Sequence, residues 1–449
     1  MSDHKKIFTD DNQKLNKISS DLLGHVRING SFLAWIAFLH ILLLVCVGYY
    51  IYQLKNGLGV TGLRDYVSWG LYIAHFVFFV AASLIGMLIS SVLGLIGYQW
   101  IKPIGRIAEI IAVAFSAVAG LVIVSDMGRP DRLPYVFMYG RVQSPILWDV
   151  TVVTTYMVIS LLLYFLPLIP DLAIAKTRLQ HAPKWLAKVY GFLSLNWNHS
   201  SKQYDILFKS MRILLILIIP TAFAIHTVTS WLFAVTPRAG WNSTIFGPYF
   251  ITGAFVTGVA GVIIMMYFFR KNYKLGNYLT DMHFDKMGKL LVLVSLVYLY
   301  FNINEFLVPA YKMEKAEAVH IQELFVGEHA LLFWGTQLSG LILPIILLLF
   351  RKMRKPLPML IISIFVFMAS WTKRYIIVVP AQEHPFLPKM YVPEKWMHYV
   401  PTAPEVFITL GTFVLAVLII TGLSKFFPVI PIWEMAEEAE KKETKEINE

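Results

Sequence analysis

Cysteine is almost absent from this chain, whose 449 residues include only Cys46. An iron–sulfur cluster needs several cysteine ligands, commonly four, and a c-type haem is attached at a Cys-x-x-Cys-His motif. A single cysteine can supply neither. The sequence therefore predicts no covalently bound cofactor, no cluster and no metal site in this chain.

Charged residues are also scarce. Asp, Glu, Lys and Arg make up 15% of the sequence, whereas hydrophobic residues make up 57%. Soluble proteins carry about 25% charged residues, so this composition predicts a protein that crosses the lipid bilayer many times. We attribute the net charge of +11 to the membrane topology of the chain, and we expect no nucleic-acid partner.

Ten apolar segments are each long enough to cross about 30 Å of hydrocarbon as a helix. A spanning segment in lipid must satisfy its own backbone hydrogen bonds, so we expect an all-α polytopic membrane protein with ten transmembrane helices. The expected spans are Ser31–Tyr52, Tyr66–Leu95, Ile104–Ser125, Ile146–Ile169, Met211–Val235, Phe250–Phe269, Leu290–Leu307, Ala330–Phe350, Met359–Val379 and Val406–Phe427.

Most of the 39 lysines and arginines lie in the two tails and in the loops after the even-numbered spans. Positively charged loops stay in the cytoplasm, so this distribution predicts that both termini are cytoplasmic. The loop after the third span, with the sequence SDMGRPDRLPYVFMYGRVQSP, then lies on the outer side. The basic loop between spans four and five is expected to contain an amphipathic helix at the inner leaflet.

Polar residues cluster near the outer ends of spans two and three. Ionisable side chains inside a membrane are costly and suggest a functional site. A quinone head group needs a hydrogen-bond donor, an acceptor and aromatic walls. The residues that meet this demand are Tyr72, His75, Asp126, Tyr135 and Tyr139.

His75 and Asp126 also have a purely structural interpretation. His75 could make a helix–helix hydrogen bond, and Asp126 could pair with Arg129 at the end of a helix that Pro130 terminates. Two other functions compete with quinone binding. A single b-type haem could be held by His75 and His226, and a secondary transporter would use helices broken by proline in mid-membrane, for which Pro220 and Pro344 are the candidates.

A second polar group lies near the inner end of span three. Arg106 and Glu109 are three residues apart and share a helix face, and Ser116 lies about two turns further along. These residues form either a local ion pair at the inner interface or the entrance of a proton pathway. Mostly apolar positions separate Ser116 from Asp126, so the sequence leaves both interpretations open.

Several stretches together resemble the NrfD/PsrC family of polysulfide-reductase membrane subunits. These are WGLYIAHFVFFVAASLIGMLIS, SDMGRPDR and QSPILWD in the first half, and HTVTSWLFAVTPRAGWNSTIFGPYFITGAF and KRYIIVVP in the second. The resemblance runs from about Tyr66 to Val379. It is to the long, ten-helix branch, which includes membrane subunits of Dsr and Hme-type complexes, hydrogenase-2-type enzymes and alternative complex III. Residues 82–85 (Ala-Ser-Leu-Ile) differ from the Gly-His-Ala-Gly of complex III, which favours the Dsr/Hme type.

The resemblance implies a membrane protein that binds menaquinone or ubiquinone and exchanges electrons with a ferredoxin-like iron–sulfur subunit on the outer face. The complex could be completed by a multihaem cytochrome or a catalytic subunit, in a bacterial or archaeal cytoplasmic membrane. The implied quinone pocket uses His75, Asp126 and Arg129. Asp126 would accept a quinol proton, and Arg129 would hold Asp126 ionised.

The resemblance also implies two like-oriented four-helix bundles. The sequence contains an echo of such a duplication, because Trp69-Gly70-Leu71-Tyr72 and Phe246-Gly247-Pro248-Tyr249 both begin spans that enter from the outside. The expected units are a cytoplasmic tail (1–30), the first span with an outer loop (31–65), bundle one with the quinone site (66–210), bundle two (211–379), an outer loop with the tenth span (380–430) and a charged cytoplasmic tail (431–449).

Overall fold

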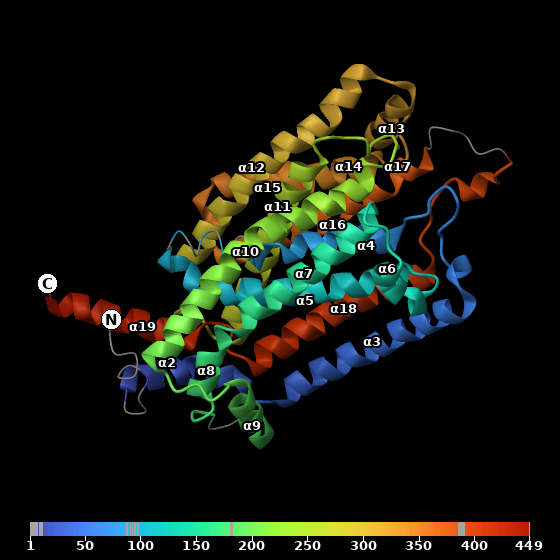
Figure 1. Cartoon of the computed structure of the whole chain (residues 1–449). Helices are drawn as coiled ribbons and strands as arrows, with labels where there is room; N and C mark the ends of the chain where they lie inside the picture. The colour runs from blue at the N-terminus through green and yellow to red at the C-terminus, as the bar shows by residue number, and fades with distance from the viewer. Residues whose placement is uncertain are drawn as a thin grey trace.

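The computed structural model describes residues 8, 12–86, 98–179, 183–384 and 391–448, together with positions 89, 91, 93 and 96. Within these residues all regular structure is helical (Figure 1). This confirms the all-α prediction.

Nine helical segments are long and apolar enough to cross a membrane, which confirms a polytopic membrane protein. Three of them are compound, because α7 continues into α8, α16 continues into α17, and a π-helical turn (Leu338–Ile342) separates α14 from α15. The helices are α3 (Gly30–Asn56), α5 (Lys102–Asp126), α7 (Pro145–Phe165) with α8 (Leu168–Ala175), α10 (Ser201–Ala234), α11 (Phe246–Asn272), α12 (Asp281–Lys312), α14 (Ala330–Gln337) with α15 (Leu343–Leu349), α16 (Pro356–Val378) with α17 (Pro380–Glu383), and α18 (Ala403–Phe426).

The second expected span, Tyr66–Leu95, coincides with a shorter helix. Helix α4 covers Leu71–Ser83, and part of the segment that follows lies outside the described residues. Twelve of its thirteen side chains are buried by neighbouring helices, so α4 lies inside the protein and not at its lipid surface. The count of ten spans stays a prediction.

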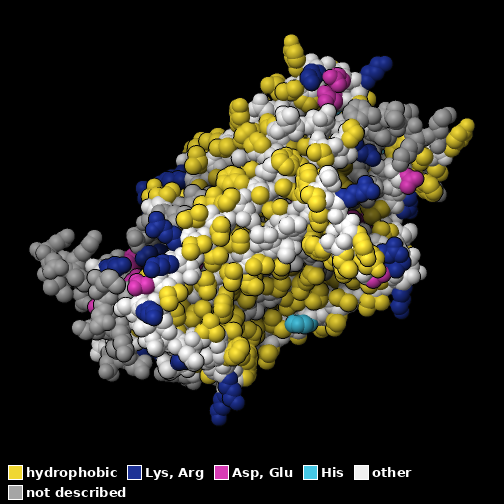
Figure 2. All heavy atoms as spheres, in the orientation of Figure 1, with side chains coloured by type: hydrophobic (Ala, Val, Ile, Leu, Met, Phe, Trp, Pro, Cys, Tyr) yellow, Lys and Arg dark blue, Asp and Glu magenta, His cyan; other side chains and the backbone are white. Residues whose placement is uncertain are grey.

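The long helices run roughly along one axis, and both termini lie at the same end of it (Figure 1). We call this the inner end and the opposite end the outer end. Hydrophobic side chains cover the middle of the face shown in Figure 2, and lysines and arginines gather towards the two ends. That belt is the surface expected to face lipid tails.

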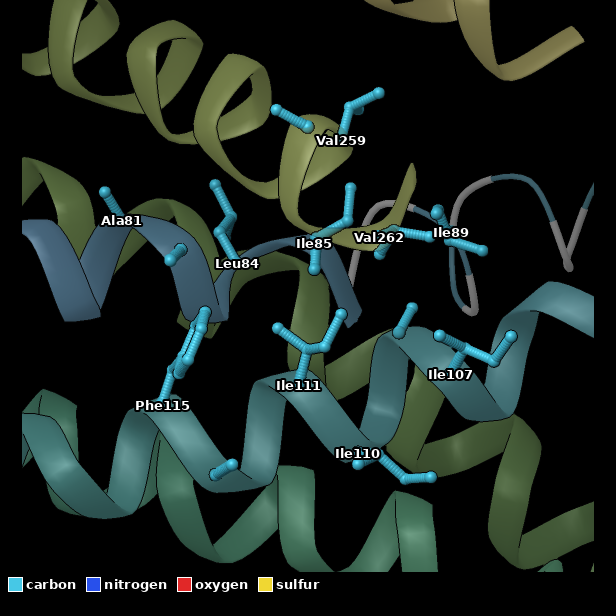
Figure 3. Close-up of a cluster of buried hydrophobic side chains, with 14 of the residues drawn as sticks. Ala81, Leu84, Ile85, Ile89, Ile107, Ile110, Ile111, Phe115, Val259 and Val262 are labelled. Atoms are coloured by element: carbon cyan, nitrogen blue, oxygen red, sulfur yellow. The ribbon is translucent and has the colours of Figure 1, made fainter. Parts of the chain in front are cut away.

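Contacts divide most of the long helices into two groups. Helices α4, α5, α7 and α10 pack against one another in sequence, and α11, α12, α14–α15 and α16 form a second set. Helix α4 touches both α11 and α16, and α18 packs between α3 and α5. Figure 3 shows the apolar core where α4, α5 and α11 meet, with Ile85, Ile111 and Val259 among the side chains. The predicted internal duplication is compatible with this grouping and stays a prediction.

Both tails contain helices that pack at the inner end. Helix α2 (Gln13–Leu23) buries Leu15 and Leu22 and contacts α19 (Ile432–Asn448), which also contacts α8. Between α8 and α10, helix α9 (Lys184–Leu193) exposes Trp185 and Phe192. Large exposed apolar side chains on a helix at the inner end are suited to a membrane interface, and the location at the inner leaflet stays a prediction.

Short helices connect these elements. At the outer end they are η2 (Leu58–Val60), η5 (Pro130–Arg132), α6 (Pro134–Met138), α13 (Lys315–Phe325) and η8 (Glu394–Trp396), and at the inner end η1 (Gly24–Val26), η4 (Gln99–Ile101) and η7 (Arg351–Arg354).

Candidate functional site

The start of α4 is held by side chains from the outer segment before α18. The Tyr399 hydroxyl accepts a hydrogen bond from the backbone N–H of Leu71 (2.9 Å) and donates to the Glu405 carboxylate (2.6 Å). A Cβ at Gly70 would lie 2.5 Å from the Tyr399 ring, so glycine is needed for this approach. Gly70 thereby allows Tyr399 to bind the first N–H group of α4.

Gln382, near the end of α17, binds the backbone just before α4. The Gln382 side-chain oxygen accepts from the backbone N–H groups of Ser68 (3.1 Å) and Trp69 (3.0 Å), and its amide donates to the Trp69 carbonyl (2.6 Å). A buried amide with this many partners is costly to replace. It therefore keeps the two helix groups in register at the outer end.

A hydrogen-bond chain joins α4 to the end of α5. The Tyr72 hydroxyl donates to the Gln53 side-chain oxygen (2.6 Å), and the Gln53 amide donates to the Ser125 carbonyl (2.7 Å). Both side chains are buried. Tyr72 and Asp126, predicted from sequence as neighbours, are thus brought to one place through Gln53 on α3.

Asp126, the last residue of α5, has an unsatisfied carboxylate oxygen. Its Oδ1 is buried and has no hydrogen-bond partner among the described residues. The neighbouring Glu405, with which its charge interacts, is fully bonded, because it accepts from Gly62 (2.7 Å) and Thr402 (2.9 Å) as well as Tyr399. Asp126 is therefore the carboxylate of this cluster with acceptor capacity left for a ligand.

The prediction that Arg129 forms an ion pair with Asp126 is wrong. Arg129 donates two hydrogen bonds to Asp131, from Nε to Oδ1 (2.9 Å) and from Nη2 to Oδ2 (2.8 Å), and both side chains are exposed. The chain leaves the helical conformation after Asp126, and η5 then places Asp131 within reach of Arg129. The Arg129 hydrogen bonds lower the pKa of Asp131 and leave Asp126 without this cation.

Tyr135 and Tyr139 lie on α6 and at its end, at the outer surface. Their rings contact each other edge to face at 5.4 Å, and 52% and 73% of the two residues' surfaces are exposed. The structure places them outside the buried Tyr72–Gln53 chain. Their predicted role as walls of the quinone pocket remains untested.

His75 lies one turn below Tyr72 on the same face of α4. Its Nδ1 accepts from the Trp371 indole (3.1 Å), and its Nε2 faces the Thr412 hydroxyl (2.7 Å), which itself donates to the Thr409 carbonyl. This pattern assigns the proton to Nε2. Both nitrogens therefore bind neighbouring helices, as the structural interpretation of His75 expected.

We expect His75→Phe to lower the free energy of unfolding by about 1–3 kcal/mol, because Trp371 and Thr412 lose their buried partner. Thermal unfolding in detergent measures this loss. In a double-mutant cycle, Thr412→Val should cost little once His75 is gone. Full stability of His75→Phe, combined with loss of quinol-linked turnover, would instead assign His75 to the ligand.

At the inner end, Arg106 is fully buried and pairs with Asp171 of α8. It also donates to the carbonyls of Pro167 (3.0 Å) and Pro428 (3.4 Å). The ion-pair partner of Arg106 is thus Asp171, which is far away in the sequence, whereas the local pair considered from the sequence was with Glu109. Ser116 is buried and donates within its own helix to Val113 (3.3 Å).

Comparison with known proteins agrees with this architecture. The model of the family described as polysulphide reductase, NrfD, matches residues 59–385. The chain belongs to the NrfD family. The matched range contains α4, the end of α5 and Gln382, whereas Gln53, Tyr399 and Glu405 lie outside it.

Two relatives align along nearly the whole chain. A selenate reductase subunit of Mesobacillus selenatarsenatis is 27% identical over 88% of this chain and 94% of its own length. The Hdr-like menaquinol oxidoreductase integral membrane subunit of Archaeoglobus fulgidus is 23% identical over 90% and 96%. A putative membrane subunit of the dimethyl sulfoxide reductase of Halobacterium salinarum is 32% identical, but over 51% of this chain and half of its own length.

This NrfD protein has a second buried polar group, in the second helix set, that was not predicted from the sequence. Tyr249, the counterpart of Tyr72 in the sequence echo, donates to Asn302 (2.9 Å), which bonds Gln337 (2.9 Å). Lys373 and Arg374 are buried close by, and the Arg374 Nε and Nη2 have no partner among the described residues. The repeated Gly-x-Tyr motif, at Gly70–Tyr72 and Gly247–Tyr249, is the sequence feature from which this group could have been predicted.

A histidine–carboxylate pair lies at the outer end of the protein. His329 Nε2 lies 2.9 Å from Glu383, whose other oxygen accepts from the Tyr399 N–H (2.9 Å). The hydrogen bond to Glu383 raises the pKa of His329 above its ordinary 6.5, against the opposing effect of burial. Protonated His329 therefore stabilises the segment that carries Tyr399.

Because the pKa of His329 is raised in the folded state, the stabilisation of the fold by protonated His329 is fully present below pH 6.5 and is lost as the pH rises through the raised value. We expect the free energy of unfolding to fall by about 1–2 kcal/mol over that interval. His329→Gln should remove this pH dependence. The exposed His398, 3.9 Å from Glu328, supplies the control, because His398→Gln should preserve it. Identical pH profiles for wild type and His329→Gln would contradict the prediction.

Proposed function

We propose that this chain is the quinone-binding membrane subunit of a respiratory oxidoreductase complex. It exchanges electrons between menaquinol and an iron–sulfur subunit at the outer end. The observation that carries the proposal is the buried, unpartnered Oδ1 of Asp126 beside the Tyr72–Gln53 chain. Two relatives named for menaquinol or menaquinone, from Archaeoglobus fulgidus and Nitratidesulfovibrio vulgaris, support the choice of quinone.

The residues suit quinol oxidation chemically. A quinol loses two electrons and two protons, and its hydroxyl protons need acceptors at the moment of electron transfer. Asp126 Oδ1 is the available base, and the Tyr72 oxygen, which donates to Gln53, retains lone pairs that can accept from the second hydroxyl. The Tyr72 hydroxyl can hold the second quinol hydroxyl by a hydrogen bond but cannot take its proton. Both electrons leave through the partner subunit, Asp126 releases the first proton at the outer end, and the second proton passes to water at the same end once the first electron has left.

The two alternatives have less support. The haem alternative requires a free nitrogen on His75, but both of its nitrogens have partners. For the transporter alternative, α10 continues through Pro220, whereas the span containing Pro344 has a π-helical turn before that residue. One irregular helix does not define a solute site, and Glu305, a buried carboxylate of the same helix set, already accepts a hydrogen bond from Ser243 (3.0 Å).

The orientation belongs to the same proposal. Basic residues concentrate at the inner end, so we place both termini in the cytoplasm of a bacterial or archaeal cell. An iron–sulfur partner, with or without a catalytic or multihaem subunit, then docks on the outer face. The test is menaquinol oxidation by the complex purified with its partners. A complex that is intact and fails to oxidise any quinol would overturn the proposal.

The inner polar group is not needed in this scheme. Arg106 is engaged with Asp171, and apolar side chains fill α5 between Ser116 and Ser125. We expect Glu109→Gln, which removes a titratable proton but keeps the size, to leave both quinol turnover and proton movement in vesicles unchanged. Reduced proton movement at unchanged turnover would show instead that the chain couples quinol oxidation to proton translocation.

A further inference from the structure

A large cleft runs from the inner end into the middle of the protein. It has a volume of about 960 Å³ and lies between η1, α3 and α18 on one side and α5, α11 and α16 on the other. This volume is at the upper end of the range for small-molecule sites. At its deep end are Phe115, Phe367 and Phe413, and the Phe413 ring packs on His75 with 4.4 Å between ring centres.

The mouth of the cleft is positively charged. Arg27 and Lys425 line it, and the Lys425 ammonium lies 4.8 Å from the centre of the Phe32 ring. Burial lowers the pKa of the third basic side chain, His25, to about 4, so it is neutral at pH 7. No aspartate or glutamate is among the described residues that line this cleft. Two cations therefore face it without a lining carboxylate to balance them.

A polar hollow adjoins the mouth. It has a volume of about 350 Å³, shares His25 and Tyr273 with the cleft, and is also lined by Asp21, Asn277 and Lys274. Asp21 accepts a hydrogen bond from Tyr278 (3.4 Å). Amides and a carboxylate in this position can bind hydroxyl groups, which apolar walls cannot.

We infer that the cleft is also accessible from the side. Trp35 of α3 and Phe268 of α11 both line it, and 44% and 42% of their surfaces are exposed. Both residues lie on spans that face the hydrocarbon of the bilayer. A lipid chain can enter here without first passing through water.

We propose that this cleft binds one anionic phospholipid from the inner leaflet. Its phosphate lies at Arg27 and Lys425, hydroxyl groups of its head group lie in the polar hollow, and an acyl chain extends towards Phe413. Basic pockets between membrane helices on the cytoplasmic side are suited to such head groups. A neutral quinone head would leave both cations unused, and a zwitterionic lipid would bring its own ammonium close to them.

Binding should be tested on the purified full-length chain with phosphatidylglycerol and phosphatidylcholine as probes. Native mass spectrometry is expected to show one phosphatidylglycerol per chain, preferred over phosphatidylcholine. Arg27→Gln with Lys425→Gln should weaken that binding about tenfold or more. Lys209→Gln is the matched control, because this exposed lysine lies at the same end of the protein and does not line the cleft, so phosphatidylglycerol binding should be unchanged.

A second variant tests the acyl-chain part without changing charge. Met265 lies on the cleft wall, and Met265→Trp should narrow the cleft and reduce retention of the lipid. Phosphatidylglycerol should raise the unfolding temperature of the wild type and not that of this variant. The proposal is overturned if the protein shows no preference for the anionic lipid, if the charge variants bind as well as Lys209→Gln, or if a quinone is recovered from the cleft in place of phospholipid. Quinol turnover is a separate readout, so failure here leaves the Asp126 proposal standing.

Discussion

Asp126→Asn is expected to lower quinol-linked electron transfer by a factor of about 10²–10⁴, the contribution typical of a positioned general base. The amide has the same shape as the carboxylate and can still bind a hydroxyl group, but it cannot accept a proton. The apparent affinity for quinol should therefore change much less than the turnover. Steady-state oxidation of a short-chain menaquinol by the purified complex measures both quantities.

Asp131→Asn is the matched control, because Asp131 lies five residues after Asp126, in the outer loop. Asp131 is exposed and paired with Arg129, so its substitution should leave turnover within about twofold of wild type, since exposed ion pairs contribute little. Equal turnover in Asp126→Asn and wild type would remove Asp126 from the mechanism. A fall as large in Asp131→Asn would show that the loop, and not the buried carboxylate, determines the activity.

Much of the fold could be predicted because lipid imposes one rule on every span. Apolar segments of about 20 residues must be helices, and nine of them are. The second segment was the exception in the described structure, because α4 is short and buried by other helices. Hydropathy cannot distinguish a helix that faces lipid from one that faces protein, since both are apolar.

The site was predicted less completely, because the residues that contact one another there are far apart in the sequence. Tyr72 and Asp126 were found because both lie at span ends, but Gln53, which joins Tyr72 to the backbone beside Asp126, lies just past the expected end of the first span and was not predicted. Arg129 was assigned to Asp126 by proximity in sequence, whereas Asp131 offered a planar, two-contact partner. Side-chain partners over such distances depend on packing, which a single sequence does not reveal.

Arg106 and Asp171 illustrate the same point at the inner end, and they carry a large expected effect on stability. Asp171→Ala should lower the free energy of unfolding by about 3–5 kcal/mol, because a fully buried guanidinium would lose its counter-charge. Asp171 also accepts from the backbone N–H of Trp433 (2.8 Å), so α19 should detach from α8. Thermal unfolding in detergent and proteolysis of the C-terminal helix measure the two effects. Lys289→Ala, which removes an exposed partner of Asp285, should cost less than about 0.5 kcal/mol.

A paired substitution separates a structural ion pair from a proton pathway. Arg106→Met combined with Asp171→Leu replaces both charges by apolar side chains of similar size, and such replacements are often neutral or stabilising. We therefore expect the double variant to regain most of the stability that Asp171→Ala loses, and to keep wild-type quinol turnover. A stable double variant that no longer moves protons in vesicles would contradict this, because removal of the charges would then have removed a function that packing alone cannot restore.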